Sequence, residues 1–395
     1  MGRIEKEWTR GSTRRAALRS LAAFAGASPF LSGQQDPFRD HSRVPRLDEL
    51  TTAFDFEPVA YANLPRLAYD FTSYGVESEF TLRRNREAFD WVELIPRGPK
   101  SGKVDTATEL FGTKLAFPIL VAPTAGHTQL HPEGEAATFR GASNASKTTM
   151  IVSHNASLPT DKISAAAKGN LWWQLYPRQS LDDTKSLLDT AQANGAQAIV
   201  VTIDQQSASF ERAMHYRNIG ARAPSTRSVR ANTEPNPYRI LINRTWYTWT
   251  YFDQIRPMVK VPMLAKGVTT AEAAAMCVER GLDGIVVSNH GGRSMDYGPS
   301  TLEVLPEIVD AVRGRIPVLI DSGFRRGSDI LKALGLGAKA VCLGRVPRWG
   351  LSAFGAEGVQ RVLEILQNEL ILAMAQTGCP TLASIDRSLV RTDFQ

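Results

Sequence analysis

Short apolar runs alternate with helical patterns along most of the chain. Eight runs rich in β-branched and aliphatic residues occur at 118–122, 149–152, 171–175, 198–202, 262–265, 284–288, 317–320 and 340–343. Unbroken apolar runs of this length are typical of strands buried on both faces, as in a parallel sheet. The pattern therefore predicts eight strands of a parallel sheet.

Helical patterns lie between most of these predicted strands. They cover residues 132–146, 181–194, 270–280, 302–313, 327–334 and 358–375, the last of which is strongly amphipathic. Eight βα units in roughly 250 residues predict an α/β fold of the (β/α)8 TIM-barrel class. The alternative is an open doubly wound sheet, but that fold would require a G-x-G-x-x-G turn after its first strand, and none is present there.

One segment interrupts the regular spacing. Residues 205–261 are rich in Arg, Pro, Asn and Ser and carry four aromatic residues between Tyr238 and Trp249. Long insertions of this kind are usually functional, for example as active-site lids. We therefore expect a long lid insertion after the fourth strand.

The beginning of the chain differs from the rest in charge. The 395-residue chain has a formal net charge of +6, and residues 1–27 hold six basic and two acidic side chains. Within them, Arg14-Arg15, a mildly apolar run and the small residues at 25–27 are typical of a twin-arginine export signal. An ordinary basic N-terminal helix or arm is the alternative.

These features predict three segments. We expect a signal peptide over 1–27, a linker rich in Pro, Ser and Gln over 28–46, and one barrel domain over 47–395. An export signal predicts a periplasmic or otherwise exported protein, whereas without export the protein would be cytoplasmic. The twin-arginine route carries folded proteins, so it suits a protein that takes up a cofactor before export.

Composition excludes several classes of protein. With 43% hydrophobic and 22% charged residues, the chain is typical of a globular protein rather than a disordered one. No stretch is long and apolar enough to span a bilayer. Outside the first 27 residues no basic surface is indicated, so we expect no nucleic-acid partner. The three cysteines form no C-x-x-C pair and lie at no metal-ligand spacing, so we expect no metal site.

Polar residues follow nearly every predicted strand. In a (β/α)8 barrel, side chains at the C-terminal ends of the strands form the active site. Glycine and arginine recur after the last two strands, as Gly323 with Arg325 and as Gly344 with Arg345. Glycine lets backbone N–H groups approach a ligand closely, and a guanidinium group binds phosphate through two parallel hydrogen bonds. The two pairs together predict a phosphate site.

Several sequence blocks stand at or near the ends of the predicted strands: 266–267 (KG), 288–297 (SNHGGRSMDY), 321–327 (DSGFRRG) and 343–345 (LGR), with further blocks at 122–125 (APTA), 131–135 (HPEGE) and 174–176 (QLY). Together these blocks resemble the FMN-dependent 2-hydroxy acid oxidase and dehydrogenase family, which includes glycolate oxidase, lactate oxidase and flavocytochrome b2. The similarity runs from about Leu64 to Asp386. It implies FMN as cofactor, oxidation of an (S)-2-hydroxy acid to the 2-oxo acid, oxygen or a quinone or redox protein as electron acceptor, and a homotetramer.

The resemblance also implies catalytic and substrate-binding roles. His290 would take the proton of the substrate hydroxyl, and Asp204 would orient His290. Lys266 would lie beside the flavin and stabilise its reduced anionic form. Tyr176 would bind the substrate oxygen, and Arg293 would hold the substrate carboxylate.

Each of these residues also has an ordinary structural interpretation. His290 would then be a buried histidine with satisfied hydrogen bonds, Asp204 a turn residue and Lys266 a surface lysine. Tyr176 would be an interior aromatic residue. Arg293 would form a structural ion pair, with Asp296 as a possible partner.

For the cofactor, the resemblance implies three groups of contacts. Residues that would contact the flavin ring are Pro123, Thr124, Ala125, Ser153, Gln174, Thr202, Lys266 and Ser288. Asp321 would bind the ribityl chain. Gly323, Arg325, Gly344 and Arg345 would bind the phosphate.

Two substrate-binding positions depart from the family pattern. Phe71 stands where the family has a tyrosine whose hydroxyl contacts the substrate carboxylate. Phe210 stands where the family has an arginine before a lid glutamate, if Glu211 is that glutamate. Because two polar contacts are lost and two phenyl rings are gained, we expect a bulkier or more apolar substrate than glycolate, or one that is not a simple acid.

Two other functions remain as alternatives. The first is another FMN barrel enzyme, such as an isomerase of the isopentenyl diphosphate type, but that class lacks the His-Gly-Gly-Arg block found at 290–293. The second is a flavin-binding protein that has lost activity towards hydroxy acids, an interpretation motivated by Phe71 and Phe210.

Overall fold

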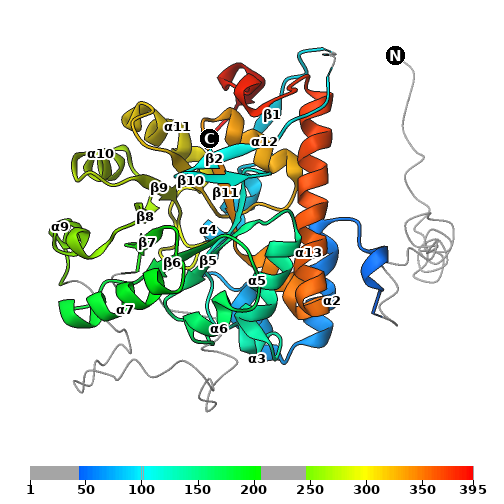
Figure 1. Ribbon diagram of the computed structural model, residues 1–395. Coiled ribbons are helices and arrows are strands. Elements are labelled where there is room, and N and C mark those ends of the chain that lie inside the picture. The colour runs from blue at the N-terminus through cyan, green and yellow to red at the C-terminus, as the bar shows by residue number, and fades with distance from the viewer. Residues whose placement is uncertain (1–43, 99, 101, 206–245, 395) are drawn as a thin grey trace, which may run out of the picture. The chain divides into compact units, whose positions relative to one another are not determined.

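Eight parallel strands close into a barrel in the computed structural model, which describes residues 44–98, 100, 102–205 and 246–394 (Figure 1). The strands are β4 (Ile119–Val121), β5 (Thr149–Ser153), β6 (Leu171–Leu175), β7 (Ile199–Thr202), β8 (Met263–Val268), β9 (Gly284–Val287), β10 (Val318–Ile320) and β11 (Ala340–Leu343). Each strand pairs with the next in sequence, and β11 pairs with β4 to close the barrel. This confirms the predicted fold and all eight predicted strands.

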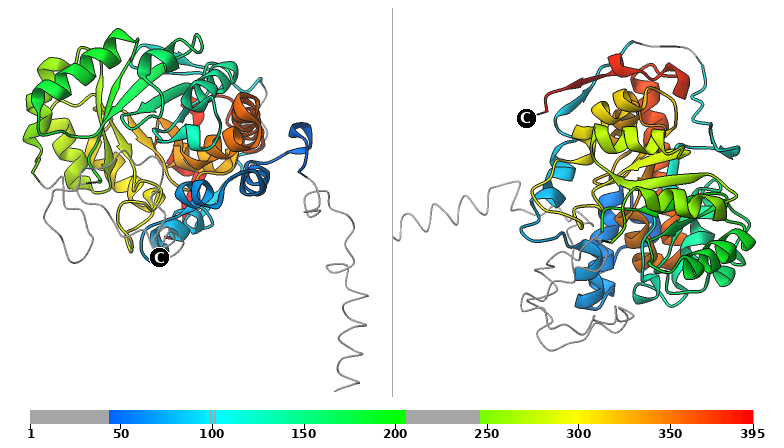
Figure 2. Two further views of the ribbon diagram at one scale, coloured as in Figure 1. Left: turned by 90° about the horizontal axis from the view of Figure 1, so that it is seen from below. Right: turned by 90° about the vertical axis from the view of Figure 1, so that its left-hand side faces the viewer.

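Helices surround the barrel (Figure 2). After the successive strands come α5 (Gly134–Asn144), α6 (Thr160–Ser164), α7 (Leu181–Ala193), α9 (Thr250–Ile255), α10 (Ala271–Glu279), α11 (Thr301–Val312), α12 (Gly327–Gly335) and α13 (Arg345–Gln376). Side-chain caps stabilise the N-termini of two of these helices. At α7 the side chain of Ser180 accepts from the N–H of Asp183, and at α11 Ser300 forms a capping box with Glu303. The predicted helix 358–375 is the second part of α13, which changes direction at Phe354 and Gly355.

Further elements precede and follow the barrel. Before it lie η1 (Leu47–Glu49), η2 (Ala53–Asp55), α2 (Phe56–Asn63), α3 (Arg66–Ser73), α4 (Phe80–Glu87), β1 (Val92–Leu94), β2 (Thr108–Leu110) and β3 (Thr113–Leu115). Short 3-10 turns follow at η3 (His127–Gln129), η4 (Arg256–Met258), η5 (Leu382–Ser384) and η6 (Arg387–Leu389), and β12 (Val390–Thr392) pairs with β1. Helix α2 packs against α13, so the N-terminal helices lie against the last helix of the barrel.

The barrel interior is filled by side chains. Leu120, Ile151, Trp172, Val200, Leu264, Val286, Leu319 and Cys342 form one buried apolar cluster, with each of the eight strands contributing a residue. Leu110 and Leu115, from the β2–β3 hairpin, belong to the same cluster. The Phe111 ring centre lies 5.6 Å from that of Trp172. The hairpin therefore closes the barrel at the end opposite the strand C-termini, and this leaves the C-terminal end for ligands.

The segment predicted as a lid is only partly described. Residues 206–245, including Phe210, lie outside the described residues, as do 1–43 with the predicted export signal. The last part of the segment is not a lid. Tyr251, Phe252 and Ile255 of α9 are buried, and α9 packs against α7 in the outer layer of helices. The prediction of one irregular insertion over 205–261 was wrong for this part. Tyr251 and Phe252 belong to a short helix of the outer layer, and their side chains are buried.

Candidate active site

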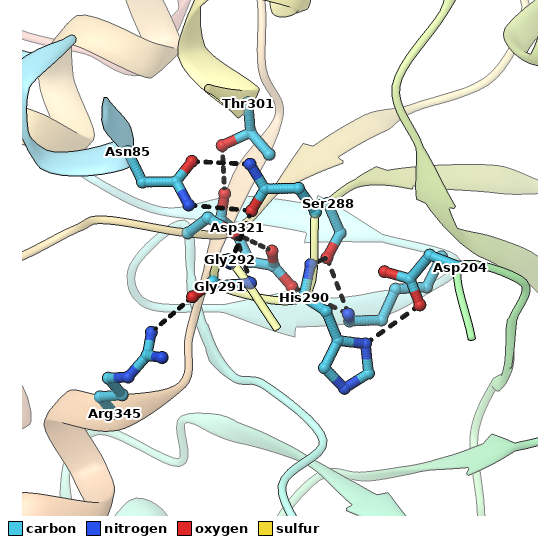
Figure 3. Close-up of polar contacts among 12 residues, drawn as sticks. Asn85, Asp204, Ser288, His290, Gly291, Gly292, Thr301, Asp321 and Arg345 are labelled. Carbon is cyan, nitrogen blue, oxygen red and sulfur yellow. Dashed lines mark hydrogen bonds and ion pairs between the residues drawn. The ribbon is translucent and has the colours of Figure 1, made fainter. Parts of the chain in front are cut away.

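His290 and Asp204 meet at the C-terminal end of the barrel. Asp204 follows β7, His290 follows β9, and the Nδ1 atom of His290 lies 3.0 Å from Oδ1 of Asp204 (Figure 3). A carboxylate only accepts hydrogen bonds, so Nδ1 carries the proton and Nε2 of a neutral His290 has a free lone pair. This is the arrangement of a general base with an orienting carboxylate.

The electrostatics of the pair favour a neutral imidazole beside a charged carboxylate. Burial lowers the pKa of His290, and Asp204 only partly offsets that effect. Burial alone would raise the pKa of Asp204, but His290 and Lys266 outweigh it and hold that pKa below its usual value. At neutral pH the site therefore contains a base that is ready to accept a proton.

An unusual backbone turn presents His290. His290, Gly291 and Gly292 have φ angles of 59°, 67° and 73°, all in the left-handed region that a histidine rarely adopts. Two buried amides hold the turn: Nδ2 of Asn85 donates to Oδ1 of Asn289 at 2.9 Å, and Nδ2 of Asn289 donates back to Oδ1 of Asn85 at 2.8 Å. The Asn289 oxygen also accepts from the N–H of Gly292 at 3.1 Å. Helix α4 thus fixes the loop that carries the base.

Lys266 is buried beside the same pair. It is 3% exposed, and its Nζ donates to Oγ of Ser288 at 2.8 Å and lies 3.3 Å from Oδ2 of Asp321. Burial alone would lower its pKa, but Asp321 and Asp204 outweigh that effect and raise it. Lys266 is therefore a fixed positive charge at the C-terminal end of the barrel, and the interpretation as a surface lysine is wrong.

Arg293 lies against the end of α3. Its Nη1 donates to the carbonyl of Phe71 at 2.5 Å, and its Nη2 donates to the hydroxyl of Tyr74 at 2.8 Å. Its Cζ is 4.0 Å from the Tyr74 ring centre and 4.9 Å from that of Phe71. Asp296 accepts from the backbone N–H of Thr81 instead, and no ion pair of Arg293 occurs among the described residues. The suggested ion pair between Arg293 and Asp296 is therefore absent from the described part of the chain. The guanidinium of Arg293 has only neutral hydrogen-bond partners there.

Two buried polar atoms at the C-terminal ends of β6 and β7 lack hydrogen-bond partners among the described residues. Nε2 of Gln174 and Oγ1 of Thr202 are buried and have no hydrogen-bond partner in the described part of the chain. Oε1 of Gln174 accepts from Oγ of Ser153 and from the N–H of His154, both at 3.2 Å, so the amide group is held with its donors free. Unsatisfied buried polar atoms are rare unless a ligand or water pairs with them. A flat polar ring such as that of FMN would satisfy both atoms.

A cavity of about 190 Å³ lies at the predicted phosphate site. Its lining is formed by Phe54, Glu57, Leu82, Asn85, Arg86, Gly323, Arg325 and Arg345. Gly323 has a φ of 87°, and a Cβ there would lie 2.1 Å from the carbonyl oxygen of Asn85, so only glycine fits. At Gly344 a Cβ would meet nothing within 4 Å, which leaves its backbone accessible to a ligand. Gly323, Arg325 and Arg345 are thus brought together around this cavity, and Gly344 directly precedes Arg345 in the chain.

Two of the three arginines that line this cavity, Arg345 and Arg325, are held by backbone oxygens. Arg345 donates to the carbonyls of Thr72, Gly291 and Tyr74 at 3.0, 2.9 and 2.7 Å, and Arg325 donates to that of Phe324 at 2.8 Å. Burial, then Arg293 and Arg325, lower the pKa of Arg345 to about 9, so it remains charged at neutral pH. Neither guanidinium pairs with a carboxylate within 4 Å in the described residues, and an anionic ligand would offset their charge.

The remaining predicted residues lie at neighbouring strand ends. Pro123, Thr124 and Ala125 follow β4 and are partly exposed at the barrel mouth. The Thr124 hydroxyl lies 2.7 Å from Nε2 of His127. Tyr176 follows β6, and its N–H donates to Nδ1 of His154 at 3.2 Å. The predicted site residues that the structure describes therefore lie near the C-terminal ends of the barrel strands or in the segments that follow them, together with Phe71 of α3.

Sequence reasoning missed three residues at this end. Tyr74 binds Arg293, the His154 ring lies tilted beside that of Tyr176 with ring centres 6.1 Å apart, and Arg348 contacts Thr72 and Ala125. His154 comes two residues after the predicted strand 149–152, and that position at a strand end is the sequence signal for it. Tyr74 and Arg348 lie outside the strand ends, and only the packing of α3 against α13 brings them to the site.

Comparisons with known proteins agree with this geometry. The sequence matches the FMN-dependent dehydrogenase family over residues 60–392. It is 38% identical over 363 residues to a peroxisomal (S)-2-hydroxyacid oxidase of Arabidopsis thaliana, which covers 88% of this chain and 98% of that protein. A 2-hydroxyacid oxidase of Dictyostelium discoideum is 36% identical over 359 residues, covering 89% and 92% of the two chains.

Solved structures give the same result. The crystal structure of a mandelate oxidase superposes with a TM-score of 0.79 at 34% identity, covering 87% of this chain and 99% of that one. The matched region includes every catalytic loop described above, and FMN is the cofactor that the family requires. The chain belongs to the family of FMN-dependent dehydrogenases.

Proposed function

We propose that this protein oxidises a 2-hydroxy acid to the corresponding 2-oxo acid with FMN as its cofactor. The observation that carries the proposal is the hydrogen bond between Nδ1 of His290 and Asp204, 3.0 Å long, beside the unsatisfied polar atoms of Gln174 and Thr202. The similarity to 2-hydroxyacid oxidases and to a mandelate oxidase supports it. When bound, FMN supplies the two-electron acceptor that the oxidation of the substrate α-carbon requires.

His290 moves the proton. Because Nδ1 is committed to Asp204, the substrate hydroxyl would give its proton to Nε2. The imidazolium that results is stabilised by the charged carboxylate of Asp204, whose own pKa stays low. Tyr176, at the end of β6, would donate a hydrogen bond to the same substrate oxygen.

Arg293 binds and orients the acid. Its guanidinium is fixed by Phe71 and Tyr74 but has no acidic partner among the described residues, so a substrate carboxylate would complete its coordination. Phe71 supplies a phenyl face beside the guanidinium rather than a hydroxyl group. This apolar wall, together with the similarity to a mandelate oxidase, supports a bulkier or more apolar substrate than glycolate.

Several residues would hold the cofactor. Gln174, Thr202 and Ser153 would face the ring, with Pro123, Thr124 and Ala125 at its edge. Lys266, held by Ser288 and Asp321, places a positive charge where it would stabilise the added electrons. The cavity lined by Gly323, Arg325 and Arg345, with Gly344 next to Arg345 in the chain, would take the phosphate. Oxygen, a quinone or a redox protein would then accept the electrons.

A substrate panel tests the proposed function. The FMN-loaded protein, mixed without oxygen with glycolate, lactate, 2-hydroxyoctanoate and mandelate, should lose its yellow absorbance with at least one acid, and kcat/KM should be higher for the larger apolar acids. The rates at which oxygen and a quinone re-oxidise the reduced flavin then identify the electron acceptor. Efficient turnover of glycolate with no gain for larger acids would contradict the substrate proposal, and no bleaching with any acid would instead favour a flavin protein without this activity.

The pH profile tests the role of His290. His290 must be neutral to act as the base, and its pKa is lowered. The acidic limb of the kcat/KM profile should therefore have its midpoint below the ordinary histidine pKa of about 6.5. Asp204→Asn removes the charge that raises the His290 pKa, so the limb should move to lower pH while kcat/KM drops at least about 100-fold. An unchanged profile in this variant, with the flavin absorbance intact across the pH range, would refute the assignment.

Comparison of FMN with riboflavin tests the phosphate site. Arg325→Ala should weaken FMN binding by about 10- to 100-fold, because a charge-assisted hydrogen bond is lost, and should leave riboflavin binding unchanged. The neighbouring Arg326, which pairs with Glu369, is the matched control. Quenching of flavin fluorescence on binding measures the affinity of the wild type and of each variant for FMN and for riboflavin. Equal losses for FMN and riboflavin would place the phosphate elsewhere.

We also propose export by the twin-arginine route, on the basis of the pattern within residues 1–27. Residues 1–46 fused to a reporter that is active only after export in the folded state should give activity in a bacterial host. Replacing Arg14 and Arg15 together by lysine should abolish that activity. Equal signals from the two fusions would argue for an ordinary basic N-terminal arm.

A further inference from the structure

Arg348 is a buried arginine whose hydrogen-bond partners among the described residues are all neutral. It lies in the first part of α13 and is 4% exposed. Its Nε and Nη2 donate to the hydroxyl of Thr72 at 3.2 and 2.8 Å, and its Nη1 donates to the carbonyl of Ala125 at 2.5 Å. All these acceptors are neutral, and the described residues include no carboxylate within 4 Å of it.

Such a group is costly to bury. A charge removed from water is destabilising unless it is paired, so a buried arginine with only neutral partners indicates that an anion lies nearby in the working protein. Glu135 acts favourably on Arg348 through space, whereas burial and then Arg293 lower the Arg348 pKa to about 9. The guanidinium is therefore charged at neutral pH, and Glu135 does not fully compensate it.

The position of Arg348 connects it to the substrate wall. Its Cζ lies 5.8 Å from the ring centre of Phe71, and the Cζ of Arg293 lies 4.9 Å from the same centre. Two guanidinium groups therefore border one phenyl ring. Thr72 and Ala125, the hydrogen-bond partners of Arg348, belong respectively to the segment that carries Phe71 and to the loop after β4.

We propose that Arg348 is a specificity-determining residue of the substrate site: its buried charge acts with Arg293 to favour anionic 2-hydroxy acids over neutral α-hydroxy compounds. This inference rests on the proposed function. Phe71 offers no hydroxyl group to the substrate carboxylate, and the charge of Arg348 compensates for that loss through space. Because the interaction is between two charges, it strengthens in a site from which water is excluded.

A purely structural role would have different consequences. If Arg348 only ties Thr72 to Ala125, then its replacement disturbs the pocket for any ligand of the same shape. If its charge selects anions, then replacement weakens the binding of acids and leaves their neutral amides unaffected. A matched acid and amide therefore separate the two roles.

The experiment compares Arg348→Gln, which keeps donors but removes the charge, with Arg348→Lys, which keeps the charge. Holoenzymes are titrated with the best acid of the substrate panel and its primary amide, beginning with (S)-mandelate and 2-hydroxy-phenylacetamide, and with the 2-oxo acid product, by KM and by flavin absorbance. Arg391→Gln removes an exposed guanidinium on β12 and serves as the control.

We expect Arg348→Gln to raise the KM of the acid and the Kd of the 2-oxo acid about tenfold, with the amide changed less than about twofold. Arg348→Lys should stay within about threefold of the wild type for all ligands. Equal shifts for acid and amide, no shift for the acid, or a lysine variant as weak as the glutamine one would overturn the inference.

Two further outcomes are distinguishable. If Arg348→Gln does not retain FMN, Arg348→Met takes its place, because an apolar chain of similar length is tolerated where a charge was buried. If the wild-type protein neither binds nor oxidises any 2-hydroxy acid, the proposed function fails before the role of Arg348 is reached. If the wild type is active and the neutral variant keeps the same preference for acid over amide, the inference about Arg348 is contradicted. The proposed function then stands.

Discussion

The turn from Ser288 to Gly292 is the constraint on which the site depends. Three successive residues in the left-handed region reverse the chain within a few ångströms of the end of β9. The reversal places the His290 ring beside Asp204 on one side and the Gly291 carbonyl against Arg345 on the other (Figure 3). The Gly292 carbonyl accepts from the N–H of Val76, so the same turn also fixes the chain that follows α3. This one turn therefore fixes the relative positions of the base His290, of Arg345 in the phosphate site, and of the segment after α3 beside the substrate wall.

The C-terminal end of α3 is the second shared element. The carbonyl oxygens at a helix C-terminus lack partners within the helix and carry partial negative charge. Here those of Phe71 and Thr72, with that of Tyr74 just beyond, accept from Arg293 and Arg345, and the Thr72 hydroxyl accepts from Arg348. In the described part of the chain no carboxylate pairs with these three positive groups within 4 Å, and so they remain available to anionic ligands.

The sequence was sufficient for the barrel and for most of the site, because both follow from local patterns. Each buried strand is an unbroken apolar run, and parallel strands bring the residues after them to one end of the sheet. His290, Asp204 and Lys266 could therefore be placed together. Tyr74 and Arg348 could not, since their positions depend on how α3 and α13 pack against each other. The helix α9 was missed because its short sequence follows a long segment rich in Arg, Pro, Asn and Ser and was grouped with it.

The hairpin β2–β3 has a consequence for how this protein can change. It closes one end of the barrel, where Phe111 lies against Trp172 and the interior is solid. The residues that keep the chain folded are thus separated along the barrel axis from the loops that touch ligands. Substitutions such as phenylalanine at position 71 alter the pocket without entering that interior. Selectivity for new acids can therefore evolve, or be engineered, in the loops while the folded state is maintained by a different set of side chains.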